Sequence, residues 1–282
     1  MSNYPIGVFA SIDAGLGVKL EVVHELGIRT IQLHTPAKAN RTAEKAREFA
    51  SKLKEYGITI TVVFLGFEGE TYETIARTAE TVGLVPKATR DARLKESYEI
   101  ADFAKVLGVH AIGSHIGFVP HVRNSADYNE VIAAVQQLCD HLKNNGQALH
   151  LETGQEEIGA LIQFIDDVQR DNLFVNFDPA NLILYGIGKP IEAVKKLGSR
   201  IRSVHCKDAL ATTGRPGIDW GKEVPFGTGQ VDAETFLRTL FETGYKGALT
   251  IEREIPEEPQ RQKEEIGQAV KLIEDLKKKI LG

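Results

Sequence analysis

Short apolar runs alternate with longer amphipathic stretches along almost the whole chain. Eight apolar runs have the length of β-strands, and they cover residues 6–10, 30–34, 58–65, 109–116, 147–152, 173–178, 201–206 and 248–252. Amphipathic stretches with helical spacing include residues 42–56, 127–145, 156–169, 189–198, 232–243 and 259–280. This alternation predicts parallel strands that are joined by right-handed helical crossovers.

The number of these units indicates a closed barrel. The chain has 282 residues, so each of eight units takes about 35, a size that suits a (β/α)8 barrel better than an open sheet. A doubly wound fold is the alternative, but the chain lacks a Gly-x-Gly-x-x-Gly motif after the first run and a phosphate-binding P-loop motif anywhere. No linker or low-complexity tract interrupts the pattern. We therefore expect an α/β fold with a single (β/α)8 TIM barrel domain over residues 1–282.

Composition excludes several classes of protein. The formal net charge is −5, which does not favour a broad surface for nucleic acid or anionic membranes. Two cysteines in no Cys-x-x-Cys arrangement do not predict a disulfide scaffold or a thiolate zinc site. The N-terminus lacks the features of a secretory signal, and no apolar run approaches the roughly 20 residues of a transmembrane helix. We expect a cytoplasmic protein with neither a nucleic-acid nor a membrane partner.

Four candidate metal ligands end the last four apolar runs: Glu152, Asp178, His205 and Glu252. The carboxyl ends of barrel strands form the active-site face, and strand alternation places all four side chains on the polar, inward face. Each residue alone is more simply a helix cap or a solvated group. Together, three carboxylates and one imidazole predict one divalent metal ion, with Mn²⁺, Mg²⁺ or Co²⁺ favoured and Zn²⁺ possible.

The segments around these residues resemble the xylose isomerase-like barrel superfamily. That superfamily includes sugar-phosphate isomerases and epimerases, ketose 3-epimerases, inosose dehydratase and the endonuclease IV type of AP endonucleases. The resemblance rests on LETG at 151–154, NFDPANL at 176–182, VHCKD at 204–208, FGTGQVD at 226–232 and IERE at 251–254. It implies that the four candidates bind the metal, and that Glu152 and Glu252 also exchange protons with a sugar.

This resemblance predicts a metal-dependent isomerase or epimerase of a sugar, a sugar phosphate or a related hydroxy-carbonyl compound, acting in carbohydrate metabolism. A metal that bridges carbonyl and hydroxyl oxygens stabilises an enediolate as its charge develops. Carboxylates on opposite faces, here Glu152 and Glu252, allow a proton to leave from one side and return on the other.

Three other functions remain open from the sequence. A lyase of the inosose dehydratase kind would use the same metal and carboxylates but would expel a hydroxyl group. An endonuclease would need further histidines, but the third run ends without one, and Asn181 stands where many relatives have His. A non-catalytic sugar-binding barrel is the fourth possibility.

Five further residues are candidate substrate contacts: His34, His115, Asn181, Lys207 and Arg215. Each has a simpler interpretation. The two histidines could be hydrogen-bonded residues of the barrel rim, and Asn181 could cap the following helix. Lys207 could bind a hydroxyl, carboxylate or phosphate group, or pair with a ligand carboxylate. Arg215 could be an exposed loop residue.

The regions that would set specificity are expected in two long loops, at residues 66–90 and 208–229. Loops at this end of a barrel carry binding residues and can form lids. The charged helix at 259–280 is expected to cover the outside of the barrel, and its apolar stripe could serve a contact in a homo-oligomer.

Overall fold

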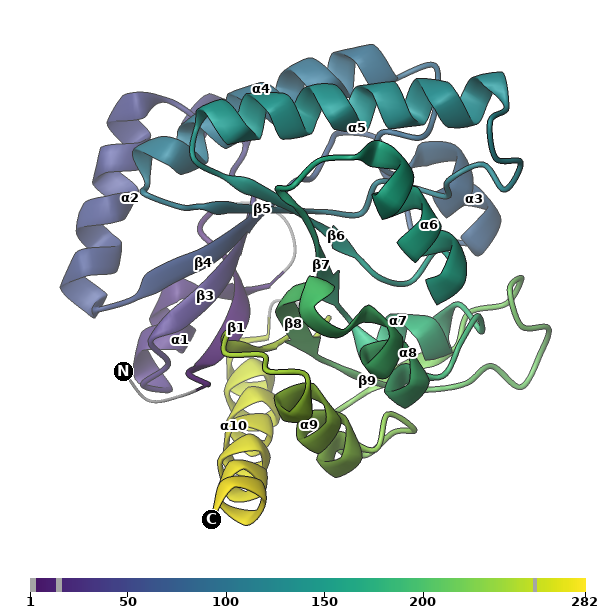
Figure 1. Cartoon of the computed structure of the whole chain (residues 1–282). Helices are drawn as coiled ribbons and strands as arrows, with labels where there is room; N and C mark the ends of the chain where they lie inside the picture. Colours follow the sequence, from purple (N-terminus) through teal and green to yellow (C-terminus); the bar gives the residue numbers. More distant parts are fainter. Residues whose placement is uncertain (1–3, 14–16, 256–257) are drawn as a thin grey trace.

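The predicted barrel is confirmed. The structure is a computed structural model, and it describes residues 4–13, 17–255 and 258–282. Parallel strands follow one another around the barrel, and the last strand pairs with the first (Figure 1). The barrel strands are β1 (Ile6–Ser11), β3 (Thr30–His34), β4 (Thr59–Phe64), β5 (Ala111–Ser114), β6 (Ala148–Glu152), β7 (Leu173–Phe177), β8 (Ile201–Cys206) and β11 (Leu249–Ile251). A two-residue strand, β2 (Val18–Lys19), pairs with the end of β1.

Helices form the outer layer of the molecule (Figure 1). They are α1 (Leu20–Glu25), α2 (Ala43–Tyr56), α3 (Ile75–Thr81), α4 (Arg90–Val106), α5 (Ala126–Asn144), α6 (Ile158–Val168), α7 (Pro179–Leu184), α8 (Pro190–Leu197), α9 (Ala233–Glu242) and α10 (Pro259–Leu281). The core lies between these helices and the strands, where side chains such as Leu149, Val175 and Phe177 are fully buried. No helix in the described ranges combines the length and the apolar character that crossing a membrane requires.

Glycines end several helices just before the next strand. Gly57 follows α2 with a φ of 65°, and its backbone N–H bonds to carbonyl groups in the last turn of the helix. This left-handed conformation costs glycine little because it has no Cβ atom. Each such end turns the chain back into the barrel, so that all the barrel strands run toward the same face.

Two segments contain more structure than the sequence predicted. The expected loop at 66–90 includes α3, which begins where the Thr74 side chain accepts a hydrogen bond from the N–H of Arg77. The expected loop at 208–229 includes an antiparallel hairpin of β9 (Asp208–Leu210) and β10 (Lys222–Val224). Both elements are too short to show a clear hydrophobic period.

Helix α4 was not predicted, because its buried face is partly polar. Arg90, Arg93 and Ser97 are all buried on it. Their polar groups bond to backbone carbonyls, for example Arg93 to Gly83 at 2.8 Å and Ser97 to Arg93 at 2.7 Å. A helix of this kind lacks the apolar stripe that identifies a helix in a sequence.

Candidate active site

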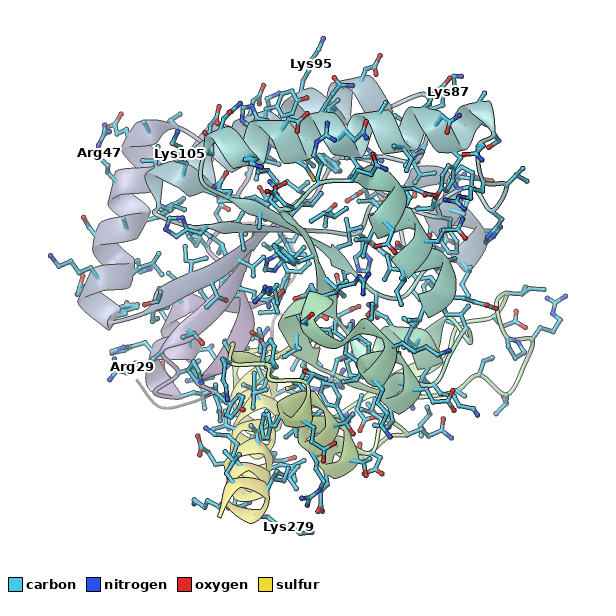
Figure 2. The ribbon with its side chains drawn as sticks, in the orientation of Figure 1. Arg29, Arg47, Lys87, Lys95, Lys105 and Lys279 are labelled. Atoms are coloured by element: carbon cyan, nitrogen blue, oxygen red, sulfur yellow. The ribbon has the colours of Figure 1, made fainter. Side chains whose placement is uncertain are left out.

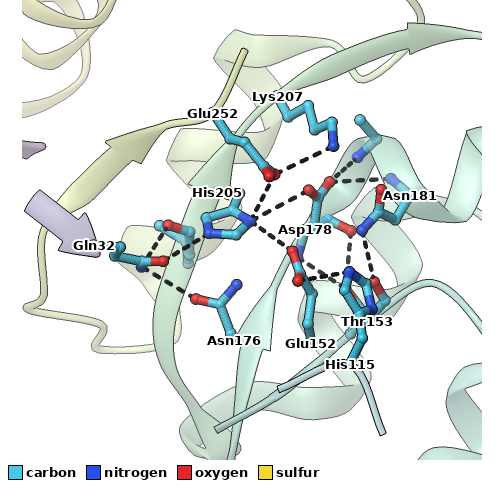
Figure 3. A network of polar contacts seen from close by, with 12 residues as sticks. Gln32, His115, Glu152, Thr153, Asn176, Asp178, Asn181, His205, Lys207 and Glu252 are labelled. Atoms are coloured by element: carbon cyan, nitrogen blue, oxygen red, sulfur yellow. Dashed lines mark hydrogen bonds and ion pairs between the residues drawn. The ribbon is translucent and has the colours of Figure 1, made fainter. Parts of the chain in front are cut away.

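The four candidate ligands converge at the carboxyl ends of four neighbouring strands (Figure 3). Glu152 ends β6, Asp178 follows β7, His205 lies near the end of β8, and Glu252 follows β11. One ligand atom from each lies within 4.8 Å of the other three. His205 Nδ1 is 2.6 Å from Glu152 Oε1 and 2.9 Å from Glu252 Oε2. It is 3.4 Å from Asp178 Oδ2.

Gln32 on β3 orients the imidazole of His205. His205 Nε2 donates a hydrogen bond to Gln32 Oε1 at 2.6 Å, and the Gln32 amide in turn donates to Asn176 Oδ1 at 3.2 Å. With the proton on Nε2, the lone pair of Nδ1 faces the three carboxylates. Histidine ligands are commonly fixed in this way by a hydrogen bond to the other ring nitrogen.

The ligand atoms fit a cation. Glu152 Oε1, Asp178 Oδ2, His205 Nδ1 and Glu252 Oε2 are buried, and within the described residues none has a hydrogen-bond partner, although Lys207 forms an ion pair with Glu252 Oε2. Buried polar groups are almost always satisfied, and buried like charges repel each other unless a positive charge lies between them. Their oxygen-rich character suits a hard divalent ion.

One oxygen of Asp178 is already used by the fold. Asp178 caps α7, and its Oδ1 accepts hydrogen bonds from the N–H groups of Ala180 and Asn181. Thr153 bonds to the backbone of Asp178 on both sides, as donor to its carbonyl and acceptor from its N–H. These contacts hold Oδ2 toward His205. Burial raises the pKa of Asp178 to about 6.

Electrostatic forces in the cluster are strong. Burial opposes the charged form of His205, but the carboxylates of Glu252 and Glu152 outweigh it and raise the pKa of His205 well above its usual value. Burial likewise opposes the charge on Glu252, but Lys207 and His205 outweigh it and hold the pKa of Glu252 well below its usual value. The cluster therefore keeps an ionised carboxylate and attracts positive charge.

Each of the two glutamates has a further cationic or imidazole partner. Glu152 Oε2 lies 2.7 Å from His115 Nε2, and Gln155 bonds to the other ring nitrogen of His115 at 3.2 Å. Glu252 Oε2 lies 3.2 Å from the ammonium group of Lys207, which also pairs with Glu254 at 2.5 Å. Glu152 is therefore paired with an imidazole and Glu252 with an ammonium group, so the two carboxylates are not equivalent.

A cavity of about 280 Å³ opens above the cluster. Four of the five predicted substrate contacts line it: His34, His115, Asn181 and Lys207. The structure does not bring Arg215 into this lining, because its side chain is exposed and pairs with Asp219 in the same loop.

Asn181 does not cap a helix, contrary to one interpretation of the sequence. Asp178 is the cap of α7, and Asn181 lies inside that helix with only 4% of its surface exposed. Its amide donates to the carbonyl of Thr153 at 3.1 Å. Since it also lines the cavity, it can still contact a substrate.

Other lining residues were missed by the sequence analysis. They are aromatic or acidic, and they include Phe9, Phe64, Glu70, Tyr72, Tyr185, Glu223 and Glu254. Gln32 was also missed, although it lies two residues before His34 in the same strand and so faces inward by alternation. A polar residue within an apolar run could have identified Gln32 as inward-facing. The sequence does not identify the lining residues in loops, because their positions depend on tertiary contacts.

The β9–β10 hairpin forms part of the cavity wall through Trp220, Gly221 and Glu223. Asp208 holds the segment that follows the hairpin. Its buried carboxylate accepts hydrogen bonds from backbone N–H groups of Gly227, Gly229, Val231 and Ala209.

The fold and the cluster together define a (β/α)8 barrel with a buried cluster, at the carboxyl ends of its strands, that could hold a metal ion. A family model described as "Xylose isomerase-like TIM barrel" matches residues 20–276, and the chain belongs to this family. The resemblance found in the sequence is therefore confirmed.

Solved structures support the same fold. The crystal structure of a xylose isomerase domain protein from Planctomyces limnophilus is 53% identical, has a TM-score of 0.97 and matches over 99% of both chains. A D-tagatose 3-epimerase-like protein is 17% identical over 96% of this chain and 98% of its own, with a TM-score of 0.71. A barrel protein from Mycobacterium smegmatis, solved in complex with magnesium, is 20% identical over 94% of this chain and 96% of its own, with a TM-score of 0.68.

Among curated proteins, "Putative L-ribulose-5-phosphate 3-epimerase SgbU" from Escherichia coli K12 is 38% identical over 76 residues. That stretch spans 27% of this chain and 26% of the relative, so the chain matches about a quarter of its length.

Proposed function

We propose that this protein is a divalent-metal-dependent isomerase or epimerase of a sugar or a related hydroxy-carbonyl compound. The observation that carries the proposal is the set of four buried ligand atoms, which meet beside a cavity that Glu152 and Glu252 line and which have no hydrogen-bond partner in the described structure. Metal-binding residues in such a position serve catalysis in barrels of this type.

Glu152, Asp178, His205 and Glu252 would hold the metal, with Mn²⁺, Mg²⁺ or Co²⁺ favoured. When bound, such an ion polarises substrate oxygens and neutralises the charge that develops on them. The other substrate groups would be bound by residues of the cavity wall, among them His34, Asn181 and Lys207.

The proton transfer is assigned to Glu152 and Glu252. One carboxylate removes the proton from the carbon beside the carbonyl, and the other returns a proton to the opposite face. Lys207, 3.2 Å from Glu252, keeps that carboxylate ionised and so able to accept a proton. His115, 2.7 Å from Glu152, fixes the direction in which the Glu152 carboxylate points.

Solved neighbours support the fold on which this assignment rests. Solved neighbours with the same fold include an L-ribulose 3-epimerase and a D-psicose 3-epimerase crystallised in the presence of D-fructose. Each is 16% identical to this chain, so they support the fold, and the chemistry rests on the cluster.

The test is deuterium exchange in D₂O, followed by NMR, with Mn²⁺-loaded protein and a panel of free and phosphorylated ketoses. We expect deuterium to enter the carbon beside the carbonyl of at least one sugar. Glu152→Gln and Glu252→Gln should each reduce the exchange rate by at least about 100-fold, since general acid–base groups contribute on this order.

The matched control is Glu264→Gln, because Glu264 is exposed on α10 and remote from the cavity lining. It should leave exchange unchanged. Exchange with no sugar of the panel, or full exchange in both glutamine variants, would contradict the proposal. Loss of water from the substrate would instead identify a lyase.

A further inference from the structure

A second hollow lies beside the metal-centred cavity. It has a volume of about 460 Å³, and its wall is largely apolar. It is lined by Ile75, Phe118, His121, Gln155, Glu157, Ala160, Tyr185, Ile187 and Gly217. No element of the proposed reaction uses this hollow.

The two hollows share their walls. Tyr185 lines both, and its ring packs against Phe118 on the side of the second hollow and Trp220 on the side of the first. The ring centroids are 5.7 and 4.6 Å apart, respectively. Gln155, in the second hollow, bonds to His115 of the first.

Three segments each supply a residue to both hollows. Tyr72 lines the first and Ile75 the second, three residues later. Trp220 lines the first and Gly217 the second. In the segment after α7, Tyr185 lines both hollows and Ile187 lines the second. The two hollows therefore adjoin at Tyr185, and a substrate that reached from the metal cluster into the second hollow would pass the ring of Tyr185.

The charges at this end of the barrel do not suit a phosphate group. Glu70, Glu152, Glu223, Glu252 and Glu254 line the first cavity, and Lys207 is the one lysine or arginine in its described lining. That ammonium group already pairs with two glutamates. The second hollow has no lysine or arginine among its described lining residues.

Arg253, which follows Glu252 in the chain, is already paired with carboxylates. It forms ion pairs with Glu223 and Glu265, at 3.0 and 2.6 Å. The lysines and arginines labelled in Figure 2 project from the outside of the molecule. A phosphate dianion needs unpaired arginine or lysine side chains, or a helix N-terminus clear of carboxylates. Lys207 is already paired with two glutamates, and α6, which borders the second hollow, has Glu157 as its N-cap, whose carboxylate repels an anion.

We propose that the substrate is an unphosphorylated sugar that carries an apolar substituent, with the sugar unit at the metal cluster and the substituent in the second hollow. This inference rests on the function proposed above and adds the class of substrate. The apolar side chains Ile75, Phe118 and Ile187 would contact the substituent. The rings of Tyr185 and Phe118 favour an aromatic group, since aromatic pairs gain from edge and stacked contacts.

The test compares three ligands that differ only at one oxygen: D-fructose, D-fructose 6-phosphate and 6-O-benzyl-D-fructose. Binding to Mn²⁺-loaded protein is measured by calorimetry. We expect the benzyl ether to bind about tenfold more tightly than D-fructose, because its ring is removed from water. The phosphate should bind at least about tenfold more weakly than the benzyl ether.

A pair of variants locates the effect. Ala160 is exposed on α6 and lines the second hollow, so Ala160→Trp fills that space without burying a new side chain in the core. This variant should abolish the advantage of the benzyl ether over D-fructose. Ala92→Trp, at an exposed position of α4, is the matched control and should keep that advantage.

The outcomes separate this inference from the proposed function. Equal or weaker binding of the benzyl ether, tighter binding of the phosphate, or no binding of any ligand would overturn the inference. If deuterium exchange occurs but the benzyl ether does not bind more tightly than D-fructose, the substrate class proposed here is wrong and the proposed isomerase or epimerase reaction is kept. If the benzyl ether binds as expected while no sugar exchanges deuterium, the reaction fails and the binding site stands.

Discussion

Gln32 decides which nitrogen of His205 faces the carboxylates. The two residues are 173 positions apart in the chain, yet the Gln32 oxygen lies 2.6 Å from His205 Nε2. Since a neutral imidazole has one donor and one acceptor nitrogen, this contact leaves Nδ1 as the acceptor. The amide therefore prepares the histidine to bind a cation.

Replacing Gln32 with leucine should weaken metal binding. The variant loses the acceptor for His205 Nε2–H, and outer partners of metal ligands are worth about 10–100-fold in affinity. We expect a loss of that size in Mn²⁺ affinity, measured by calorimetry, with a circular dichroism spectrum like that of the wild type. Gln137→Leu, on the exposed side of α5, serves as the control. Unchanged affinity in the Gln32 variant would contradict the role given to Gln32.

Glu156 is a second buried carboxyl group, and it lies outside the metal cluster. Its Oε1 accepts a hydrogen bond from the Val119 N–H at 2.7 Å, and burial raises its pKa to about 7. In the unfolded chain this pKa is near 4.5. The folded protein therefore holds a proton that the unfolded chain releases, and its stability falls as the pH rises from about 4.5 to 7.

Glu156→Gln should remove this part of the pH dependence. The amide keeps an acceptor for Val119 but cannot ionise. Relative to the wild type, the variant should gain stability as the pH rises through this window, by an amount on the order of 3 kcal/mol above pH 7. Denaturant unfolding at pH 5 and pH 8 measures the difference. Glu157→Gln, at the exposed next position, should show no such gain, and a gain in both variants or in neither would refute the assignment.

At the scale of elements, the loops after the strands build the cavity above the metal cluster. Asp208 accepts hydrogen bonds from three backbone N–H groups after the β9–β10 hairpin and from the N–H of Ala209 within β9, all at 2.9–3.0 Å. Gly229 must lie close to this carboxylate, because a Cβ atom there would be 2.3 Å from Asp208 Oδ1. The segment that follows the hairpin is therefore anchored on the buried side chain of Asp208.

Asp208→Ala should loosen this wall. Removing a charged acceptor from several buried N–H groups costs about 3 kcal/mol or more of unfolding free energy. Hydrogen exchange should show faster exchange of the Gly227, Gly229 and Val231 amides, while the amides of β6 stay protected. Asp219→Ala, in the same loop but partly exposed, is the comparison. Equal protection of these three amides in wild type and Asp208→Ala would contradict this role.

The sequence predicted the barrel strands well because each is an apolar run of strand length, and the last four runs have an inward-facing polar residue at or next to their ends. It predicted the longer amphipathic helices for a similar reason. It did not predict α3, α7 or the β9–β10 hairpin, because these short elements are stabilised by caps and tertiary contacts. The partly polar buried face of α4 hid that helix as well.

At the scale of the whole molecule, barrel closure brings distant residues to one point. Glu152 and Glu252 lie 100 positions apart in the chain, and strand order alone placed them near each other. Strand alternation predicted which side chains face inward, so the four candidate ligands could be selected from their places in the sequence. It could not predict that Tyr185 or Glu254 lines the cavity, because those positions depend on loop conformation. A single domain, a cytoplasmic location and a homo-oligomer stay predictions.

The proposal that four residues from four strands hold one divalent ion can be tested by measurement. The most direct measurement is the metal content per chain, by mass spectrometry of protein that is stripped of metal, loaded with Mn²⁺ and desalted, combined with calorimetric titration. We predict one ion per chain for the wild type and at least about a 100-fold loss of affinity in Asp178→Asn, because that variant removes a charged ligand. The absence of a bound ion in the wild type, or equal affinity in the variant, would contradict the claim.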